Sequence, residues 1–442
     1  MKLFKMLISI VIFIGAYSCN CEDDVLENNT QLTTQSSIRS YEEALAIAKS
    51  SISMIEEAHA TTRFGNTEHR SIDLSNSMVI TDKATRSANQ SDTALYVFNF
   101  KDDNGFALVS ANPNTEGLIA VTESGNYKDC VKENTAFAEY ISMAKRMIRD
   151  SIKPYPKEPE GRIPMIKRDT LSREQRGPYI SVQWGQDYPE GVFCPNEVAG
   201  CVNVAILQIL SYYKYPKQIK LTYQNADSTF IKLDWDKMRL HTTSSSMLET
   251  SCSPYYHKAH SDIAHLCRQI AEYTHSQFIP EELNFNYNLY NYYYYGGRCL
   301  DYELRTKASI DDAHNAFSLL GYTTSNILDY KPGCTCTPLS KYQLIYMRGR
   351  DENSKYGHAW VVDGFKKYVV KTESYETTDF TITTITTVYN HINWGQNGRC
   401  NGYFLDNVFA PQKSNQYDNN KPKDDISNYK VDISYFTINN KL

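Results

Sequence analysis

The sequence has no long cluster of lysine and arginine. Its 46 basic and 51 acidic residues give a formal net charge of −5 at neutral pH. A basic patch is what attracts a protein to nucleic acid or to an anionic membrane surface, so the composition gives no reason to expect either. We predict no nucleic-acid partner.

Long apolar runs are also absent beyond the N-terminus, where a spanning helix would need about 18 consecutive apolar residues. Lys2 and Lys5 precede the apolar run 6–14, and small residues lead to Cys19, which is the pattern of a secretory signal peptide. A cysteine at this place resembles a bacterial lipoprotein processing site, where Cys19 would carry lipid. The alternative is an ordinary signal peptide in which Cys19 is incidental.

We therefore expect a signal peptide at 1–18 and a polar, lipid-anchored tether at 19–37. Membrane contact would come only through a lipid on Cys19. The protein would be exported from a bacterial cell to the envelope or surface, with the mature domain either retained there or released.

The cysteines lack the spacing of a zinc site. Cys334 and Cys336 form one close pair, but no second Cys/His pair in zinc spacing accompanies it. We predict no metal and no cofactor. The sequence has 11 cysteines, which in an exported chain favours disulfides, although the pairing cannot be read from the sequence.

The N-terminal part has the patterns of a small α+β unit. An N-cap serine, early acidic residues and an apolar stripe predict a helix at 40–49, and helical periodicity returns at 137–152. Strand-like runs at 94–100 and 105–110 predict a hairpin, and 118–121 is a third candidate strand. No catalytic constellation is evident in this unit, to which we assign residues 38–152.

Residues 153–176 are rich in proline and basic residues, which predicts an exposed, extended segment open to proteolysis. The segment is either a passive linker or an activation segment. Residues 177–442 are then enough for one enzyme domain. Within it, the tyrosine-rich run 284–295 is a surface strand or a ligand-contacting loop, and the β-branched run 377–389 predicts a strand or hairpin of the scaffold.

The run from Ala199 to Pro216 predicts a helix with one apolar face. Cys201 follows Gly200 and falls in the first turn, where unpaired N–H groups and the helix dipole favour a thiolate. A buried structural thiol is the alternative. A nucleophilic cysteine would also require a base, a group that orients the base, and donors for an oxyanion.

Three further motifs offer such groups. His358 opens a predicted strand, 358–362, which Asp363 and Gly364 would end in a turn. Asn393 and Trp394 stand at a predicted strand end, where an amide can orient an imidazole and an indole can shield the hydrogen bond. Upstream of Cys201, both Gln183 and Gln186 could supply an oxyanion donor.

Taken together, these motifs resemble those of the streptopain-like cysteine peptidases, a bacterial papain-fold family. The shared features are a glutamine-bearing segment, Gly-Cys before a helix ending in Tyr-x-x-Tyr-Pro, Gly-His-Ala before Asp-Gly, and Asn-Trp-Gly. The N-terminal unit resembles the family's propeptide through its Glu-Glu-Ala-Leu helix and Phe-Ala-Leu-Val-Ser strand. Two departures are Gln396, where the family often has a second tryptophan, and a longer segment from Asp363 to Asn393.

The resemblance implies an α+β fold, with a papain-like peptidase domain preceded by a small inhibitory propeptide. It implies a secreted cysteine endopeptidase made as a zymogen, acting on proteins or peptides, with its own propeptide as an intramolecular inhibitor. The implied roles are nucleophile for Cys201, general base and acid for His358, oxyanion donor for Gln186, orientation of His358 by Asn393, and shielding by Trp394. The alternatives are an inactive surface-binding lipoprotein and an acyltransferase or amidase with the same triad.

Overall fold

The computed structural model describes ten stretches of the chain. They are residues 38–61, 69–81, 93–151, 165–223, 229–240, 258–279, 305–350, 357–375, 380–409 and 432–440. The tyrosine-rich run 284–295 and the tether lie outside these residues. No helix in the described stretches is both long enough and apolar enough to cross a bilayer.

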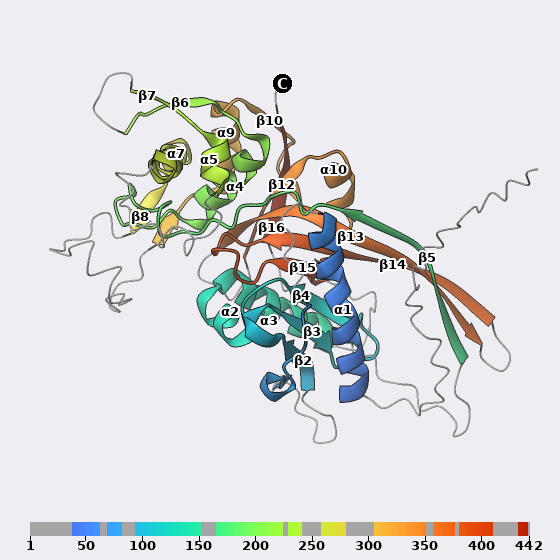
Figure 1. Cartoon of the computed structure of the whole chain (residues 1–442). Helices are drawn as coiled ribbons and strands as arrows, with labels where there is room; N and C mark the ends of the chain where they lie inside the picture. Colours follow the sequence, from blue (N-terminus) through green and yellow to red (C-terminus); the bar gives the residue numbers. More distant parts are fainter. Residues whose placement is uncertain are drawn as a thin grey trace, which may run out of the picture.

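In its described residues, the N-terminal unit has three helices and four antiparallel strands (Figure 1). The helices are α1 (Tyr41–Thr61), α2 (Tyr127–Glu133) and α3 (Thr135–Asp150), with the 3-10 turns η1 (Leu74–Asn76) and η2 (Lys101–Asp103). The strands are β1 (Met78–Thr81), β2 (Thr93–Asn99), β3 (Phe106–Ser110) and β4 (Leu118–Thr122). The hairpin, the third strand and both helices predicted from the sequence are confirmed.

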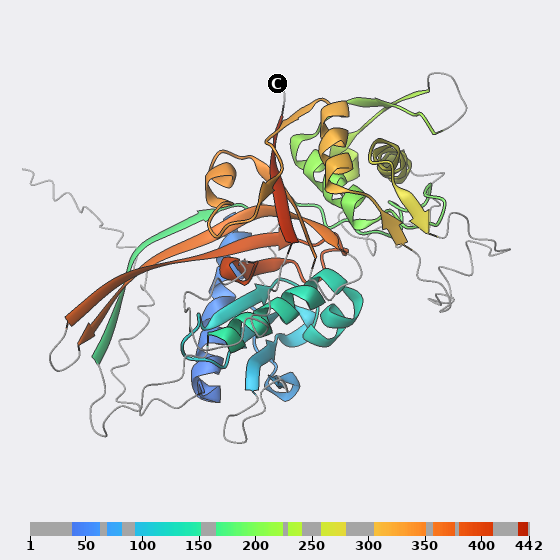
Figure 2. The same cartoon turned by 180° about the vertical axis from the view of Figure 1, so that it is seen from behind.

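The larger C-terminal part combines a helical half with a sheet half. Its helices are α4 (Cys201–Tyr213), α5 (Trp235–Leu240), α7 (Lys258–Tyr273), α9 (Ile310–Leu319), α10 (Cys336–Ser340) and the 3-10 turn η3 (Asp406–Phe409). Its sheet strands are β5 (Met165–Arg176), β10 (Tyr322–Thr324), β11 (Leu328–Asp329), β12 (Leu344–Arg350), β13 (His358–Tyr375), β14 (Phe380–Asn393), β15 (Gly402–Leu405) and β16 (Asp432–Asn440). Two small hairpins add β6 (Gln218–Lys220), β7 (Phe230–Lys232), β8 (Gln277–Ile279) and β9 (Arg305–Lys307). Helices α4, α5, α7 and α9 gather on the side away from the N-terminal unit (Figure 2).

One sheet runs through both parts of the protein. Its order is β1-β2-β3-β4-β15-β14-β13-β12-β16-β10, so the junction between the two parts is the antiparallel pairing of β4 with β15. Gly402 pairs with Thr122 at this junction, and a Cβ added at Gly402 would lie 2.2 Å from the carbonyl oxygen of Val121. A glycine therefore lets the two strands approach.

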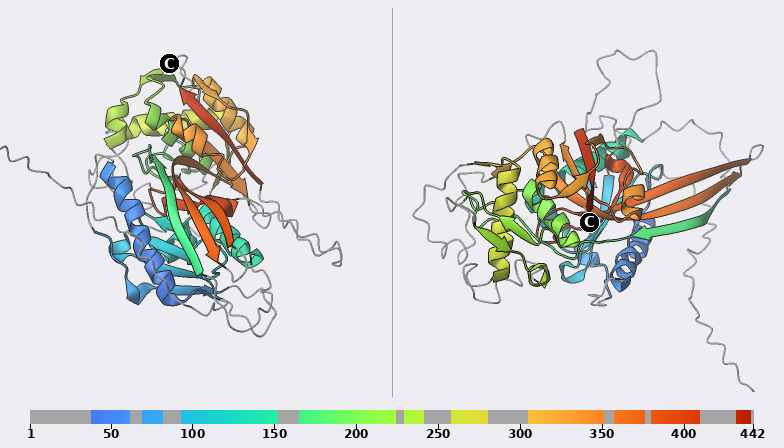
Figure 3. Two further views of the ribbon diagram at one scale, coloured as in Figure 1. Left: turned by 90° about the vertical axis from the view of Figure 1, so that its right-hand side faces the viewer. Right: turned by 90° about the horizontal axis from the view of Figure 1, so that it is seen from above.

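Strands β13 and β14 form a long ribbon that projects from the body together with β5 (Figure 3). The strand or hairpin predicted at 377–389 is confirmed as a strand from Phe380 onward, while 377–379 lie outside the described residues. The ribbon also corrects the expected turn at Asp363 and Gly364, because β13 continues to Tyr375 and only a register irregularity separates Val362 from Gly364. A turn at this place would expose Asp363, whereas its carboxylate is buried. The carboxylate accepts a hydrogen bond from the Ile180 N–H and contacts the imidazole of His391.

The C-terminal half of the predicted linker is a strand. Residues 165–176 form β5, which pairs antiparallel with β13 from Arg176 opposite Phe365 to Met165 opposite Tyr375. The segment is extended, as predicted, and most of its described side chains are exposed. Its incorporation into the ribbon was not predicted, because the partner strand lies almost two hundred positions downstream.

Candidate active site

Cys201 is the first residue of α4. Gly200 precedes the helix at φ +87°, and a Cβ added there would meet Thr306 at 2.8 Å, so both the backbone angle and the space require glycine. The apolar stripe of α4 is buried, which fixes the helix in the core. Cys201 itself is only partly buried, as expected for a group that must meet a ligand.

The surroundings of the Cys201 thiol act in two directions. Burial raises its pKa above the ordinary value, while the backbone N–H groups of Ala359, Val202 and Cys201 lower it by hydrogen bonding to the sulfur, and the charge of Arg348 lowers it further. Burial outweighs these contributions. The thiolate expected from the helix N-terminus is therefore not the favoured form in this state of the protein, although the donors that would hold it are present.

His358 begins β13, as predicted, and its neighbour Ala359 reaches Cys201. The His358 imidazole, however, is engaged by the N-terminal unit, because its Nε2 lies 2.5 Å from Oγ1 of Thr135 at the start of α3. Burial lowers the pKa of His358 to about 4, so the imidazole is neutral near pH 7. Across the described residues, no hydrogen bond joins this imidazole to Cys201 or to Asn393.

The two candidate glutamines lie in different places. The carbonyl of Gln186 accepts a hydrogen bond from the N–H of Ala199 at 2.8 Å, which fixes Gln186 beside the turn that leads into Cys201. Gln183 instead packs against the turn after β14, where a Cβ added to Gly398 would lie 2.5 Å from its Cδ. The oxyanion role of Gln186 stays a prediction, since this bond fixes its backbone rather than its side-chain amide.

Asn393 is buried at the end of β14, and both the oxygen and the nitrogen of its amide make hydrogen bonds. Its Oδ1 accepts from Nε2 of Gln208 at 3.0 Å and from the N–H of Gly395 at 3.1 Å, while its Nδ2 donates to the carbonyl of Val182 at 3.1 Å. These bonds tie α4 and the glutamine-bearing segment to the strand end. The orientation of His358 by Asn393 thus remains a prediction, since this state contains no such bond between the described side chains.

Trp394 is buried and packs between aromatic rings. Its ring centroid lies 5.3 Å from that of Trp360, two residues after His358, and 5.2 Å from that of Phe404. The backbone N–H of Trp394 donates to Oδ1 of Asn401 at 3.0 Å. The indole therefore stiffens the start of β13 and the end of β14, and its shielding role stays a prediction.

A second histidine, His391, lies in an ionic cluster that the sequence did not reveal. Its Nδ1 is 2.6 Å from Asp363 of β13 and its Nε2 is 3.2 Å from Glu123, which follows β4 of the N-terminal unit. Burial alone would lower the pKa of His391, but the two carboxylates raise it to about 10. The imidazolium therefore joins the two parts of the protein. Because Asp363 and Glu123 are distant from His391 in the sequence, no local pattern predicts this cluster.

Cys130 and Cys400 form a disulfide between α2 of the N-terminal unit and the turn before β15. Cys194, Cys201, Cys267, Cys334 and Cys336 are free. The described part of the chain contains no group of three or more His, Cys, Asp or Glu side chains placed to hold a metal ion.

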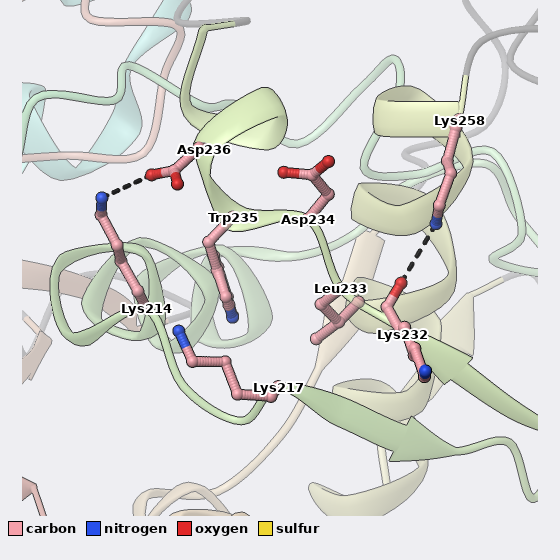
Figure 4. Close-up of a pocket in the computed structure, with 8 residues that line it drawn as sticks. All are labelled: Lys214, Lys217, Lys232, Leu233, Asp234, Trp235, Asp236 and Lys258. Atoms are coloured by element: carbon pink, nitrogen blue, oxygen red, sulfur yellow. Dashed lines mark hydrogen bonds and ion pairs between the residues drawn. The ribbon is translucent and has the colours of Figure 1, made fainter.

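A surface hollow of about 360 Å³ lies in the helical half and contains none of these groups (Figure 4). Its lining residues are Lys214, Lys217, Lys232, Leu233, Asp234, Trp235, Asp236 and Lys258. Lys214 pairs with Asp236 and Lys258 with Asp262, so part of the positive charge is neutralised internally. The hollow gives no sign of a catalytic role.

Comparison with known proteins gives two family matches and a similar solved structure. Residues 183–404 match the model of the Peptidase C10 family, and residues 31–148 match that of the Spi protease inhibitor. A solved fragment of prointerpain A from Prevotella intermedia has a TM-score of 0.46 and 16% identity, covering 82% of this chain and 98% of that one. No curated protein matches the chain.

The two family matches define a cysteine peptidase that carries an inhibitory propeptide ahead of its catalytic domain. Because the first match spans half of the sequence, the chain belongs to the Peptidase C10 family, which contains the streptopain-like enzymes. The resemblance, the fold class and the expected thiol-dependent hydrolysis are confirmed. A binding protein without activity, or an acyltransferase, is not favoured. The N-terminal unit is called the propeptide below.

Proposed function

We propose that Cys201 and His358 carry out peptide hydrolysis once the propeptide has left the site. The observation that supports this assignment is the hydrogen bond from the N–H of Ala359 to the sulfur of Cys201, which brings the start of β13 to the start of α4. His358 precedes Ala359 directly. A turn of its side chain away from Thr135 would bring the imidazole toward the thiol.

In the proposed reaction, His358 accepts the thiol proton and the Cys201 thiolate attacks the scissile carbonyl carbon. The carbonyl electrons move to oxygen, where the N–H of Cys201 and the amide of Gln186 donate hydrogen bonds. His358 then protonates the leaving amine as the C–N bond breaks, which leaves a thioester on Cys201. Water, deprotonated by His358, hydrolyses the thioester and regenerates the thiol. Asn393 would orient and Trp394 would shield His358 in this active state.

The inactive state of the precursor follows from the same groups. Thr135 engages Nε2 of His358, the imidazole is neutral, and burial keeps Cys201 as a thiol. Neither half of a thiolate–imidazolium pair is then formed. We assign residues 38–152 to the propeptide, 153–176 to the segment cut on activation and 177–442 to the peptidase domain.

The test of the nucleophile is Cys201→Ser in the activated enzyme. We expect loss of all measurable peptide cleavage and loss of labelling by iodoacetamide at this position, because a serine hydroxyl is not ionised by the same surroundings. The matched control is Cys336→Ser, another free and partly buried cysteine, which should keep full activity. Full activity in Cys201→Ser would overturn the assignment.

We also propose that the protein is exported and anchored through a lipid on Cys19. The supporting observation is the sequence of Lys2 and Lys5, the apolar run 6–14 and the small residues before Cys19. Cells grown with an alkyne fatty acid should label the native protein but not Cys19→Ala. Equal labelling of both would exclude lipid at this residue, and would not affect the assignment of Cys201.

A further inference from the structure

The propeptide and the peptidase domain are joined by the peptide chain between α3 and β5 and, among the described cysteines, by the Cys130–Cys400 disulfide. Any cut between Asp150 and Met165 leaves Cys130 on the N-terminal fragment and Cys400 on the C-terminal one. We propose that this disulfide keeps the propeptide on the enzyme after the connecting chain is cut, so that activation requires reduction as well as proteolysis.

The disulfide lies where the propeptide approaches the catalytic groups. On the propeptide side, Cys130 belongs to α2, and only Asn134 separates that helix from Thr135, which contacts His358. On the enzyme side, Cys400 lies in the turn between β14, which ends at Asn393, and β15. The bond thus ties the corner that engages His358 to the turn that follows Trp394.

Non-covalent contacts surround the disulfide. The N–H of Cys400 donates to the carbonyl of Ser124 at 3.3 Å, the N–H of Glu123 donates to the carbonyl of Asn401 at 2.8 Å, and Ser124 Oγ donates to Gly398 at 2.8 Å. A propeptide held only by such contacts would leave at a rate set by its affinity. A tethered one stays at an effective concentration on the order of millimolar and rebinds after each opening.

Burial of both sulfurs orders the two reactions. Cys130 is 2% exposed and Cys400 is fully buried, so a thiol in solution cannot reach the disulfide while the propeptide is docked. Cutting the chain allows larger openings of the propeptide and should make the bond accessible. A dithiol reductant then attacks one sulfur as thiolate and displaces the other as thiolate, and its second thiol resolves the mixed disulfide. Two protein thiols and one oxidised dithiol result.

The proposal rests on the inhibitory role of the propeptide at His358, so its test needs a readout that does not depend on catalysis. Residues 157–162 are replaced by the recognition site of a site-specific viral protease in a Cys201→Ala background. After complete cutting, the native cysteine pair should keep both fragments together in denaturing electrophoresis without reductant and separate them with reductant. The matched Cys130→Ser/Cys400→Ser protein should separate in both cases.

The same cut is then made in protein with Cys201 intact. Before the assay, a sample of each preparation is titrated with iodoacetamide in the absence of reductant. This establishes that Cys201 is reduced in both. The cut protein with the native pair should cleave a peptide substrate at least tenfold more slowly than the cut serine variant, and a dithiol should remove the difference. Separation of the fragments without reductant, or equal activity of the two cut proteins, would overturn the proposal. Inactivity of both after reduction would instead refute the proposed catalytic roles.

Discussion

The propeptide contacts two histidines of the peptidase domain, and their surroundings are opposite. His358 meets the uncharged hydroxyl of Thr135, and burial lowers its pKa to about 4. His391 lies between the carboxylates of Asp363 and Glu123, which raise its pKa to about 10. One imidazole is therefore neutral and the other charged at the same pH.

This difference separates inhibition from attachment. The contact at His358 is a single hydrogen bond to an exposed threonine, which is weak enough to be given up when the propeptide leaves. The contact at His391 is a buried ion pair that neighbours the β4–β15 pairing and the disulfide. The propeptide is thus held by the ion pair, the strand pairing and the disulfide, whereas it acts on His358 through one weak hydrogen bond from Thr135.

Replacement of each histidine by alanine should give the largest effects, on activity in one case and on stability in the other. In the activated enzyme, His358→Ala should lower kcat/KM about a thousandfold because the general base and acid is lost. In the precursor, His391→Ala should lower the free energy of unfolding by about 3–5 kcal/mol, because Asp363 and Glu123 are left buried without a cation. Peptide hydrolysis and denaturant unfolding measure the two.

The exposed His275, which pairs with Asp312 at the surface, provides the control. His275→Ala should change neither quantity by more than about 1 kcal/mol or its equivalent in rate. A precursor as stable with His391→Ala as with the native residue would remove the distinction between the two regions.

The next largest effect should be the dependence of precursor stability on pH, which reflects the charge on His391. A pKa of about 10 in the folded protein lies above the value of about 6.5 for an unfolded histidine. The stabilisation is therefore complete below about pH 6.5 and is lost as the pH rises through about 10. The stability difference between the native precursor and His391→Gln should shrink across this window, measured by denaturant unfolding at fixed salt.

Replacement of one carboxylate sharpens this test. Asp363 and Glu123 both raise the pKa of His391, and the Tyr403 ring packs against the imidazole at 5.1 Å. Glu123→Gln should therefore move the loss of stability to lower pH. An unchanged profile would show that His391 does not depend on the propeptide.

The smallest effect is expected at the inhibitory contact. Thr135→Val removes the hydroxyl that meets Nε2 of His358 and keeps the shape of the side chain. The loss of one hydrogen bond, worth about 1 kcal/mol, should raise the residual peptidase activity of the uncut precursor about fivefold. Thr81→Val, in the exposed end of β1, is the matched control and should leave the residual activity unchanged. Equal activity in both variants would mean that Thr135 does not hold His358.

Elements whose information is local could be predicted well. The stripe of α4 follows from apolar residues at helical spacing, and the place of Cys201 follows from Gly200 before it. The start of β13 at His358 and the end of β14 at Asn393 were likewise read from short patterns. The turn expected at Asp363 failed, because a bulge inside a long strand uses the same residues as a turn.

Contacts between distant segments could not be predicted. Thr135 and His358 are 223 positions apart, and Cys130 and Cys400 are 270 apart. Eleven cysteines allow many pairings. Nothing in the sequence around a threonine indicates which histidine its hydroxyl contacts. The likeness to a known family supplied the catalytic roles, but neither the disulfide nor the cluster around His391.

The sequence by itself determined which elements form and which residue types stand at their ends, because backbone propensity and apolar spacing act over a few positions. The tertiary structure alone decided that β4 pairs with β15, that Glu123 meets His391 and that Cys130 reaches Cys400. These depend on packing two separately patterned units into one sheet. The charge state of each histidine follows from that packing, since burial and neighbouring charges set a pKa and neither is encoded locally.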